Sequence, residues 1–134
     1  MLKALVNQGV PGTHIILIQK IYENLEGRIV TDKIGEYFKI GKGIKQGDPL
    51  SPILFTCALE EVFRNLDWSK KEININGENL NNIRFTDDVV LIAGNKEELQ
   101  QMITELNEAG KRAGLEINIR NTKILSNDQE ESVI

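Results

Sequence analysis

The sequence predicts an α+β domain in which helices pack on one face of an antiparallel sheet. Apolar residues recur at helical spacing between Asn95 and Gly114, which predicts an amphipathic helix. A second, more continuously apolar run, ILFTCALEEVFRNL, follows Pro52. Alternating segments joined by turn residues, such as Asn76-Gly77, predict short antiparallel strands between the two. Helices and hairpins in this order, without βαβ repeats, indicate the α+β class.

The composition is that of one globular domain followed by a short tail. Of the 134 residues, 40% are apolar and 27% are charged, and the net charge is −4. This charge does not by itself indicate a nucleic-acid partner, because phosphate binding depends on lysine and arginine. A single cysteine and a single histidine exclude an internal disulfide and a Cys/His zinc site. We expect residues 1–126 to form the domain and residues 127–134 to be a disordered acidic tail.

No apolar run is long enough to span a membrane, and the N-terminus lacks the features of a signal peptide. The sequence therefore predicts a soluble intracellular protein that does not bind membranes.

The first third of the chain predicts a helix followed by a hairpin. Thr13 is the expected N-cap of a helix with apolar residues at helical spacing, which should end near Gly27. Two strand-like runs, GRIVT and GEYFKI, then predict a hairpin. The glycines and prolines between Gly41 and Pro52 indicate a loop, and Ser51 is the expected cap of a largely buried helix.

The second half predicts two hairpins, a capped helix and two final strands. Asn76-Gly77 is a strong hairpin turn. Asn95, with Glu98 three residues later, resembles a capping box, and Gly114 is the expected C-terminal cap of that helix. The last strands are expected in LEINI and TKILS.

Two adjacent carboxylates, Asp87 and Asp88, are predicted to lie at the tip of the last of the predicted hairpins, where the chain should reverse. Aspartate is common in turns, which is the purely structural interpretation. However, a two-residue hairpin turn needs positive φ, which Asp-Asp supplies poorly, and adjacent like charges repel. A divalent cation such as Mg²⁺ removes that repulsion and prefers oxygen ligands. These two residues alone leave both interpretations open.

The loop GIKQGDPLSP is the second candidate for a binding site. Gly47 permits a close approach of the backbone to a ligand, and Gln46 offers donors and acceptors to a base or sugar edge. The alternative is an ordinary loop that leads into a helix.

Taken together, these stretches resemble the reverse transcriptases of non-LTR (LINE-type) retrotransposons. GIKQGDPLSPILF resembles motif B of that family, IRFTDDVVLIA resembles motif C, and the amphipathic helix with GLEINIRNTKIL resembles motif D. The segment LVNQGVPGTHIILIQKIYEN and the hairpin after it are similar to the region between motifs A and B. The resemblance covers nearly the whole chain in the right order.

The resemblance implies a polymerase palm, which residues 1–126 would partly form, and template-directed nucleotidyl transfer by two Mg²⁺ ions, with Mn²⁺ as an alternative. Asp87 and Asp88 would be the catalytic metal ligands. Residues implied to contact the nucleotide, template or primer end are Gln46, Gly47, Phe85, Thr86 and Lys123. The implied partners are an RNA template, a DNA primer and a deoxynucleoside triphosphate.

Three departures from the family pattern limit these expectations. The aspartate of motif A is expected to precede Met1, together with most of the fingers, and the thumb should follow the chain. Thr86 stands where the family typically has alanine, and Asn121 stands where motif D usually has lysine, with Arg120 and Lys123 close by. We therefore expect the isolated chain to be inactive.

Two other functions remain open from the sequence. One is a non-catalytic remnant that acts as a nucleic-acid-binding or protein-interaction module. The other is an unrelated Mg²⁺-dependent nucleotidyltransferase or cyclase domain. That domain would need an acidic ligand on an early strand. None of the early acidic residues lies in a clearly apolar strand context: Glu23, Glu26, Asp32 and Glu36.

Overall fold

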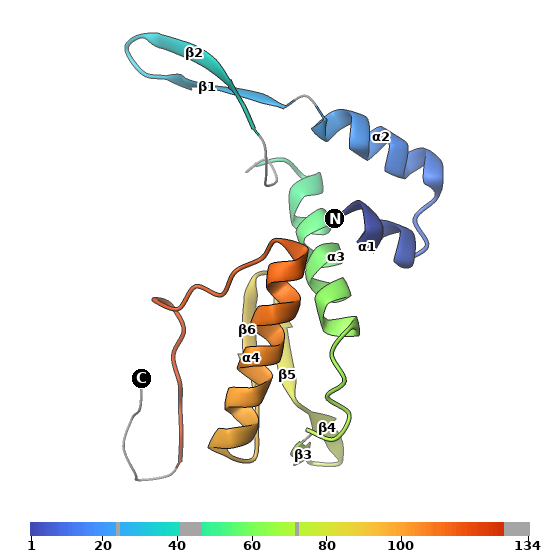
Figure 1. The fold of residues 1–134 in the computed structure, drawn as a ribbon, viewed down its shortest axis with the longest axis vertical. Helices are drawn as coiled ribbons and strands as arrows, with labels where there is room; N and C mark the ends of the chain where they lie inside the picture. Colours follow the sequence, from blue (N-terminus) through green and yellow to red (C-terminus); the bar gives the residue numbers. More distant parts are fainter. Residues whose placement is uncertain (24, 41–46, 72, 128–134) are drawn as a thin grey trace.

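The computed structural model describes residues 1–23, 25–40, 47–71 and 73–127. The described elements are α1 (Leu2–Asn7), α2 (Gly12–Tyr22), β1 (Glu26–Val30), β2 (Ile34–Lys39), α3 (Leu50–Arg64), β3 (Ile73–Ile75), β4 (Glu78–Leu80), β5 (Asn82–Phe85), β6 (Asp88–Leu91) and α4 (Lys96–Ala113). Helix α3 runs through the middle of the molecule, α4 covers the β5–β6 hairpin, and the β1–β2 hairpin projects away from both (Figure 1). The predicted α+β class is confirmed.

The strands form three separate antiparallel hairpins, β1–β2, β3–β4 and β5–β6, where the sequence predicted one sheet. In the β3–β4 hairpin the turn residues Asn76 and Gly77 have φ of 54° and 92°, which confirms the predicted turn. The β5–β6 hairpin packs against the helices, because β6 contacts α4.

The start of α2 differs from the prediction. The helix begins at Gly12, and no side chain caps its first turn, so Thr13 is not an N-cap. It ends at Tyr22 rather than near Gly27, which belongs to β1. Pro11 instead provides the entry: its φ is −56°, and its carbonyl accepts from the backbone N–H groups of His14 and Ile15. Helix α1 before it was not predicted.

The start of α3 also differs: the helix begins at Leu50 after Pro49, and Ser51 lies within it rather than capping it. The Asp48 carboxylate accepts from the backbone N–H of Leu50 at 2.8 Å. Ser51 is buried, and its hydroxyl lies 3.3 Å from the Tyr22 hydroxyl, so it joins α3 to α2. The helix is buried along one side only, and Ile53 is 60% exposed, so the prediction of a largely buried helix is only partly correct.

Helix α4 has the predicted caps. The Asn95 side chain accepts from the Glu98 backbone N–H at 2.8 Å, and Gly114 takes the left-handed conformation with φ of 80°. After the helix, Leu115 N–H donates to the Gly110 carbonyl and Gly114 N–H donates to the Lys111 carbonyl. This pair of bonds is a Schellman motif, which turns the chain back along the helix.

The main hydrophobic core lies between α3 and α4 and includes the loop after α3. Its buried members are Val62, Phe63, Trp68, Met102, Leu106 and Ala109. Val89 and Leu91 of β6 pack against it, as do Leu115 and Ile117 after α4. The hairpin that carries the two aspartates is therefore attached to the core through β6.

The two strands predicted after α4 do not form in the described residues, where 115–126 are irregular. Leu115 and Ile117 reach the core, but Ile119 is 81% exposed and a turn follows it, in which Thr122 N–H donates to the Asn118 carbonyl. Alternation alone predicted strands, yet the structure shows no strand paired with this segment. In the part of the chain that the structure describes, no helix is both long and apolar enough to cross a membrane.

Candidate active site

The β5–β6 turn lies one residue earlier than the sequence predicted. Phe85 pairs with Asp88, so the two turn residues are Thr86 and Asp87, and Asp88 is the first residue of β6. The prediction that the chain reverses at Asp87 and Asp88 is therefore wrong by one residue. The positive φ that such a turn needs is supplied by Thr86, whose φ is 53°.

Thr86 also holds the side chain of Asp87. Its hydroxyl donates to one carboxylate oxygen, Oδ1, at 2.9 Å. The second oxygen of Asp87 takes no part in this contact, so it can serve a ligand while Thr86 orients the group. A β-branched residue is unusual at positive φ, so the turn stores strain beside the candidate ligands.

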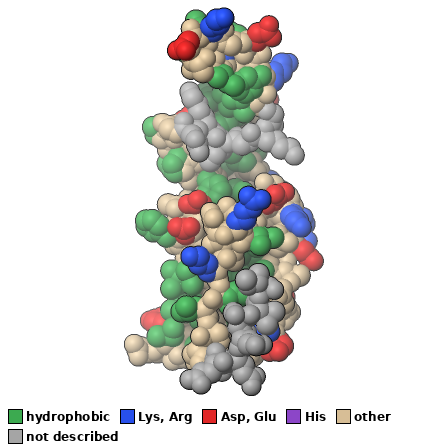
Figure 2. All heavy atoms as spheres, turned by 90° about the vertical axis from the view of Figure 1, so that its left-hand side faces the viewer, with side chains coloured by type: hydrophobic (Ala, Val, Ile, Leu, Met, Phe, Trp, Pro, Cys, Tyr) green, Lys and Arg blue, Asp and Glu red, His purple; other side chains and the backbone are tan. Residues whose placement is uncertain are grey.

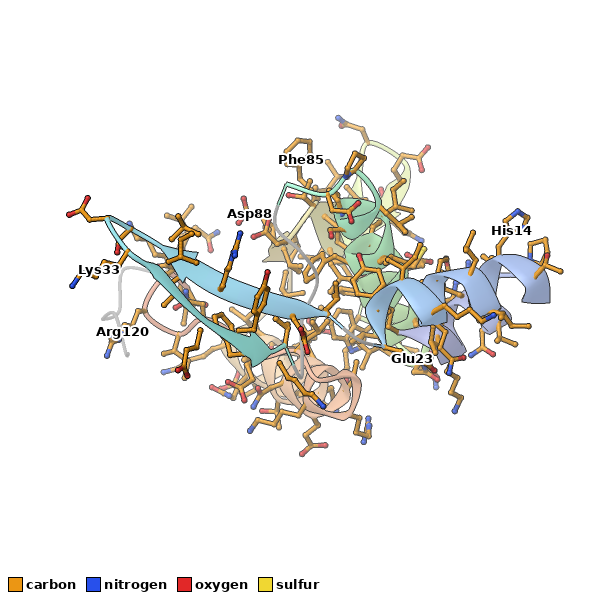
Figure 3. The ribbon with its side chains drawn as sticks, turned by 90° about the horizontal axis from the view of Figure 1, so that it is seen from above. His14, Glu23, Lys33, Phe85, Asp88 and Arg120 are labelled. Atoms are coloured by element: carbon orange, nitrogen blue, oxygen red, sulfur yellow. The ribbon has the colours of Figure 1, made fainter. Side chains whose placement is uncertain are left out.

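Asp88 lies on the face of the hairpin that points away from the helices. Its neighbours on β6, Val89 and Leu91, face the core, and residues alternate along a strand, so Asp88 and Val90 face outward. Phe85, the cross-strand partner of Asp88, is 76% exposed. Figure 3 shows Phe85 and Asp88 at the same end of the hairpin. An apolar surface with a carboxylate at its end is thus open to solvent.

A cavity of about 620 Å³ lies between β6, α3, α4 and the segment after α4. The two aspartates are among the residues that line it, at its edge, because the Asp88 side chain stands on the outer face of β6. Most of its interior is apolar, with side chains such as Leu59, Ile103 and Ile117. Polar residues from the C-terminal segment line it together with the aspartates: Glu116, Asn118, Asn121, Thr122 and Lys123. On the face of the molecule that carries this C-terminal segment, hydrophobic side chains are exposed next to charged side chains (Figure 2). A volume of this size is typical of ligand pockets.

The cavity brings together some of the predicted site residues and not others. Asp87, Asp88 and Lys123 all line it, although Lys123 is far from the aspartates in sequence. Phe85 and Thr86 belong to the same hairpin but do not line the cavity. Gly47 is exposed before α3, with φ of 83°. Gln46 lies outside the described residues.

The donor chemistry of Asp87 and Asp88 suits a divalent cation. Both side chains are exposed, and carboxylate oxygens are the ligands preferred by Mg²⁺. This ion is commonly held by one or two carboxylates, with water and substrate phosphates as the other ligands. Among the described residues, no group of three aspartate, glutamate, histidine or cysteine side chains is arranged to hold a metal. The two aspartates thus fit as a partial set of ligands.

Sequence reasoning missed the contribution of Asn118 and Thr122 to the cavity. These residues were assigned to strands or to the interval between them, whereas the Schellman motif at Gly114 returns the segment toward β6. The glycine cap followed by Leu115 was the available signal, since a hydrophobic residue at this position often accompanies the motif.

A second set of charged residues lies at the other side of the β5–β6 hairpin. Glu60 accepts from Arg64 at 3.1 Å and from Arg84 at 2.7 Å. The hydrogen bond from Arg64, followed by that from Arg84, holds the pKa of Glu60 below its usual value, although partial burial opposes this effect. This group, which was not predicted from the sequence, joins β5 to α3.

The hairpin with its paired carboxylates, the helix before it and the capped helix after it define a palm-like α+β domain. A family profile described as reverse transcriptase (RNA-dependent DNA polymerase) matches residues 2–133. The chain therefore belongs to the reverse transcriptase family, as the sequence motifs indicated. Members of this family use divalent metal ions and bind a nucleic-acid template, a primer and deoxynucleoside triphosphates.

Several of the similar proteins are polyproteins of retrotransposable elements. The chain is 33% identical over 101 residues to the retrovirus-related Pol polyprotein from type-1 retrotransposable element R2 of Nasonia vitripennis, covering 75% of this chain and 10% of that protein. It is 30% identical over 126 residues to the R2 polyprotein of Bradysia coprophila, covering 94% of the chain and 14% of that protein. The chain is 32% identical over 111 residues to the retrovirus-related Pol polyprotein from type-2 retrotransposable element R2DM of Drosophila melanogaster, covering 82% of this chain and 10% of that protein.

The chain thus corresponds to a palm segment of a non-LTR retrotransposon reverse transcriptase. It spans 10–14% of the length of the three curated relatives named above.

Proposed function

We propose that this chain forms the metal- and nucleotide-binding part of a palm that copies RNA into DNA. The observation that carries the proposal is the shared cavity, because it places Asp87, Asp88 and Lys123 around one space although Lys123 comes from a different segment. The proposed assembly is the larger reverse transcriptase, with an RNA template and a DNA primer as its partners.

Each residue has a proposed role that follows from its chemistry. Asp87 and Asp88 would hold Mg²⁺, for which Mn²⁺ could substitute. A bound ion would supply activation of the primer hydroxyl and neutralisation of charge on the phosphates. Lys123 contributes positive charge to the side of the cavity where the triphosphate would bind. Thr86 orients Asp87 through its hydroxyl.

Phe85 and the motif B loop complete the proposal. Phe85 is exposed beside Asp88, so its ring can support the primer end. Gly47 and Gln46 would approach the nucleotide and template, since a glycine leaves room for a close backbone contact.

Two carboxylates can hold one ion with a substrate phosphate, whereas the two-ion reaction requires further ligands. We therefore propose that the isolated chain binds a metal ion without extending a primer. In the complete enzyme, other segments would supply the remaining ligands and hold the template.

The direct test is a Mn²⁺ titration of the whole chain observed by NMR. Mn²⁺ is expected to broaden the amide signals of residues 86–89 first, and those of residues 121–123 with them, because both groups border one cavity. Asp87→Asn should remove this effect, whereas Asp67→Asn, at an exposed turn elsewhere, should leave it unchanged. Identical spectra of the wild-type chain with and without Mn²⁺ would overturn the metal assignment.

The second test addresses substrate class. With Mn²⁺ present, a fluorescent deoxynucleoside triphosphate is expected to bind. Lys123→Gln should weaken the binding of this nucleotide and leave the Mn²⁺ affinity in the NMR titration unchanged. Equal binding in the presence of EDTA would contradict the proposed site.

A non-catalytic interaction module is the second candidate, and the exposed apolar side chains of the β1–β2 hairpin favour it. Ile29, Val30, Ile34, Tyr37 and Phe38 are all more than half exposed. This function predicts that a partner protein covers the hairpin and that Asp87→Asn has no effect on its binding.

A further inference from the structure

Arg84 lies on the helix-facing side of the β5–β6 hairpin, immediately before Phe85 and close to the turn. Its cross-strand partner is Val89, which packs against the hydrophobic core. Directly paired residues point to the same face of an antiparallel pair, so Arg84 and Val89 both face the helices. The last helix-facing side chain of β5 before the two aspartates is therefore an arginine.

The guanidinium group of Arg84 makes two different contacts with α3. One nitrogen, Nη1, donates to Oε2 of Glu60 at 2.7 Å. The central carbon of the group lies 4.5 Å from the centroid of the Phe63 ring, which is buried in the core. The first contact fixes one nitrogen, and the second fixes the plane of the group over a side chain that cannot move freely.

Glu60 is itself held in place, which makes it a fixed point for Arg84. Its other oxygen, Oε1, accepts from Arg64 Nε at 3.1 Å, one helical turn further along α3. An isolated ion pair on a protein surface contributes little, because two flexible side chains must be ordered. Here Arg64 and Phe63 have already ordered the surroundings of the pair.

The two strands are thus attached to the helices by different chemistry. Val89 and Leu91 attach β6 through apolar packing against the core, whereas Arg84 attaches β5 to α3 through its charge and its planar group. Apolar packing tolerates sliding more readily than a hydrogen bond with defined geometry does. The turn between the strands carries Asp87, so its placement depends on both attachments.

We propose that Arg84 is a positioning residue for the metal site: by fixing β5 to Glu60 and Phe63, it sets where Asp87 and Asp88 stand relative to α3. Arg84 itself touches neither the metal nor the substrate. This inference rests on the proposed function, since it assigns Arg84 a role in forming that site.

Two variants separate the contributions of charge and shape. Arg84→Met keeps the aliphatic stem and removes the charge and the planar group. Arg84→Lys keeps the charge but cannot stack a planar group over Phe63 while it donates to Glu60. The matched control is Lys71→Met, which removes the ion pair of Lys71 with Glu105 at 2.9 Å, on the loop and α4 rather than on the hairpin.

The first measurement is the Mn²⁺ titration by NMR on the whole chain. Loss of a residue that orients a metal ligand typically weakens affinity by about tenfold or more, so we expect a tenfold weaker Mn²⁺ affinity for Arg84→Met. Arg84→Lys is expected to fall between Arg84→Met and the wild type. Lys71→Met should bind Mn²⁺ as the wild type does, even if it unfolds at a lower urea concentration.

The second measurement is amide hydrogen exchange, which needs no metal. Arg84→Met is expected to accelerate exchange at residues 84–89 while exchange within α4 stays close to that of the wild type, because the hairpin opens locally.

The outcomes distinguish this inference from the proposed function. If the wild-type chain binds Mn²⁺ and Arg84→Met binds it equally well, or if Lys71→Met weakens binding as much, Arg84 has no positioning role and the metal site stands. If the wild-type chain binds no Mn²⁺, the proposed function and the role of Arg84 in it both fail. Unchanged exchange at residues 84–89 in Arg84→Met would also overturn the proposed anchoring.

Discussion

The indole N–H of Trp68 donates to the Glu105 carboxylate at 2.6 Å, which joins the loop after α3 to the middle of α4. Lys71 donates to the same carboxylate at 2.9 Å, and the Trp68 ring meets the Phe63 ring edge-on. Trp68 is 4% exposed, and a buried indole N–H usually needs a hydrogen-bond partner, which Glu105 supplies. A single glutamate therefore satisfies a buried donor and anchors the loop.

Removing this acceptor should destabilise the chain measurably. A buried donor left without a partner costs about 1–3 kcal/mol, so Glu105→Ala is expected to lower the free energy of unfolding by about that amount. Trp68 is the only tryptophan, so its fluorescence during urea unfolding provides the measurement. Glu108→Ala, at an exposed position on the same helix, is the control and should change stability little. Equal effects of the two variants would show that the bond to Trp68 contributes nothing.

Stability should also decline in acid. Hydrogen bonds from Lys71 and then Trp68 hold the pKa of Glu105 below the ordinary value of 4.5, and Arg64 and Arg84 do the same for Glu60. A lowered pKa in the folded state means that the stabilisation is complete above about 4.5 and is lost as the pH falls through the lower folded-state values. We expect the urea concentration at the unfolding midpoint to decrease when the pH is lowered below 4.5. The decrease should be smaller in the double variant Glu60→Gln, Glu105→Gln. An identical decline in that variant would assign the acid sensitivity to other carboxylates.

Truncating the most completely buried side chain of the core should cause the largest loss of stability. Met102 is completely buried between α3 and α4. Truncating a buried side chain of this size costs about 2–5 kcal/mol, so Met102→Ala should strongly lower the urea midpoint. Ile119→Ala, at a position that is 81% exposed, should leave the midpoint nearly unchanged. A small loss for Met102→Ala would show that the two helices repack around the cavity that it leaves.

The β1–β2 hairpin has one position where only glycine fits. A Cβ atom on Gly35 would lie 2.9 Å from the backbone carbonyl oxygen of Ile29, so the two strands would have to move apart. Gly35→Ala is expected to weaken the cross-strand NMR contacts between Arg28 and Tyr37, which are direct partners in the ladder. Gly12→Ala should preserve these contacts, because the new methyl group would meet no atom within 4 Å.

The sequence predicted the helix caps and the turns more accurately than the sheet, because caps and turns depend on neighbouring residues. The α4 caps at Asn95 and Gly114 and the turn at Asn76 depend on residues close in sequence, so the sequence was sufficient to place them. The strands expected after Gly114 depend on a distant strand with which to pair, and alternation alone cannot show whether one is available. Ser51 illustrates the same limit, since its partner is Tyr22 on another helix.

For the candidate site, the sequence predicted Asp87, Asp88 and Lys123, and these three residues line one cavity in the structure. It did not identify the attachment of Arg84 to Glu60, because the pairing of a strand with a helix 24 residues earlier has no local signal. The turn register does not follow from the Asp-Asp pair, because Thr86 rather than Asp88 is in the turn and adopts positive φ.

That register leads to the last prediction, at Thr86. A β-branched residue with φ of 53° is strained, whereas glycine and asparagine adopt this conformation at lower cost. Thr86→Gly and Thr86→Asn are therefore expected to stabilise the β5–β6 hairpin by about 1 kcal/mol, the lower end of the cost of such strain. The measurement is protection of the amides in residues 82–91 against hydrogen exchange, which should increase.

The β3–β4 turn provides the matched control, since Asn76 has nearly the same φ of 54°. Asn76→Thr places a β-branched residue in the conformation that Thr86 has, so it should reduce protection in residues 73–80. Opposite changes at the two turns would show that the backbone conformation carries the cost. If Thr86→Gly reduces protection instead, the hydroxyl bond to Asp87 contributes more than the strain removes, and Thr86 is retained for that contact.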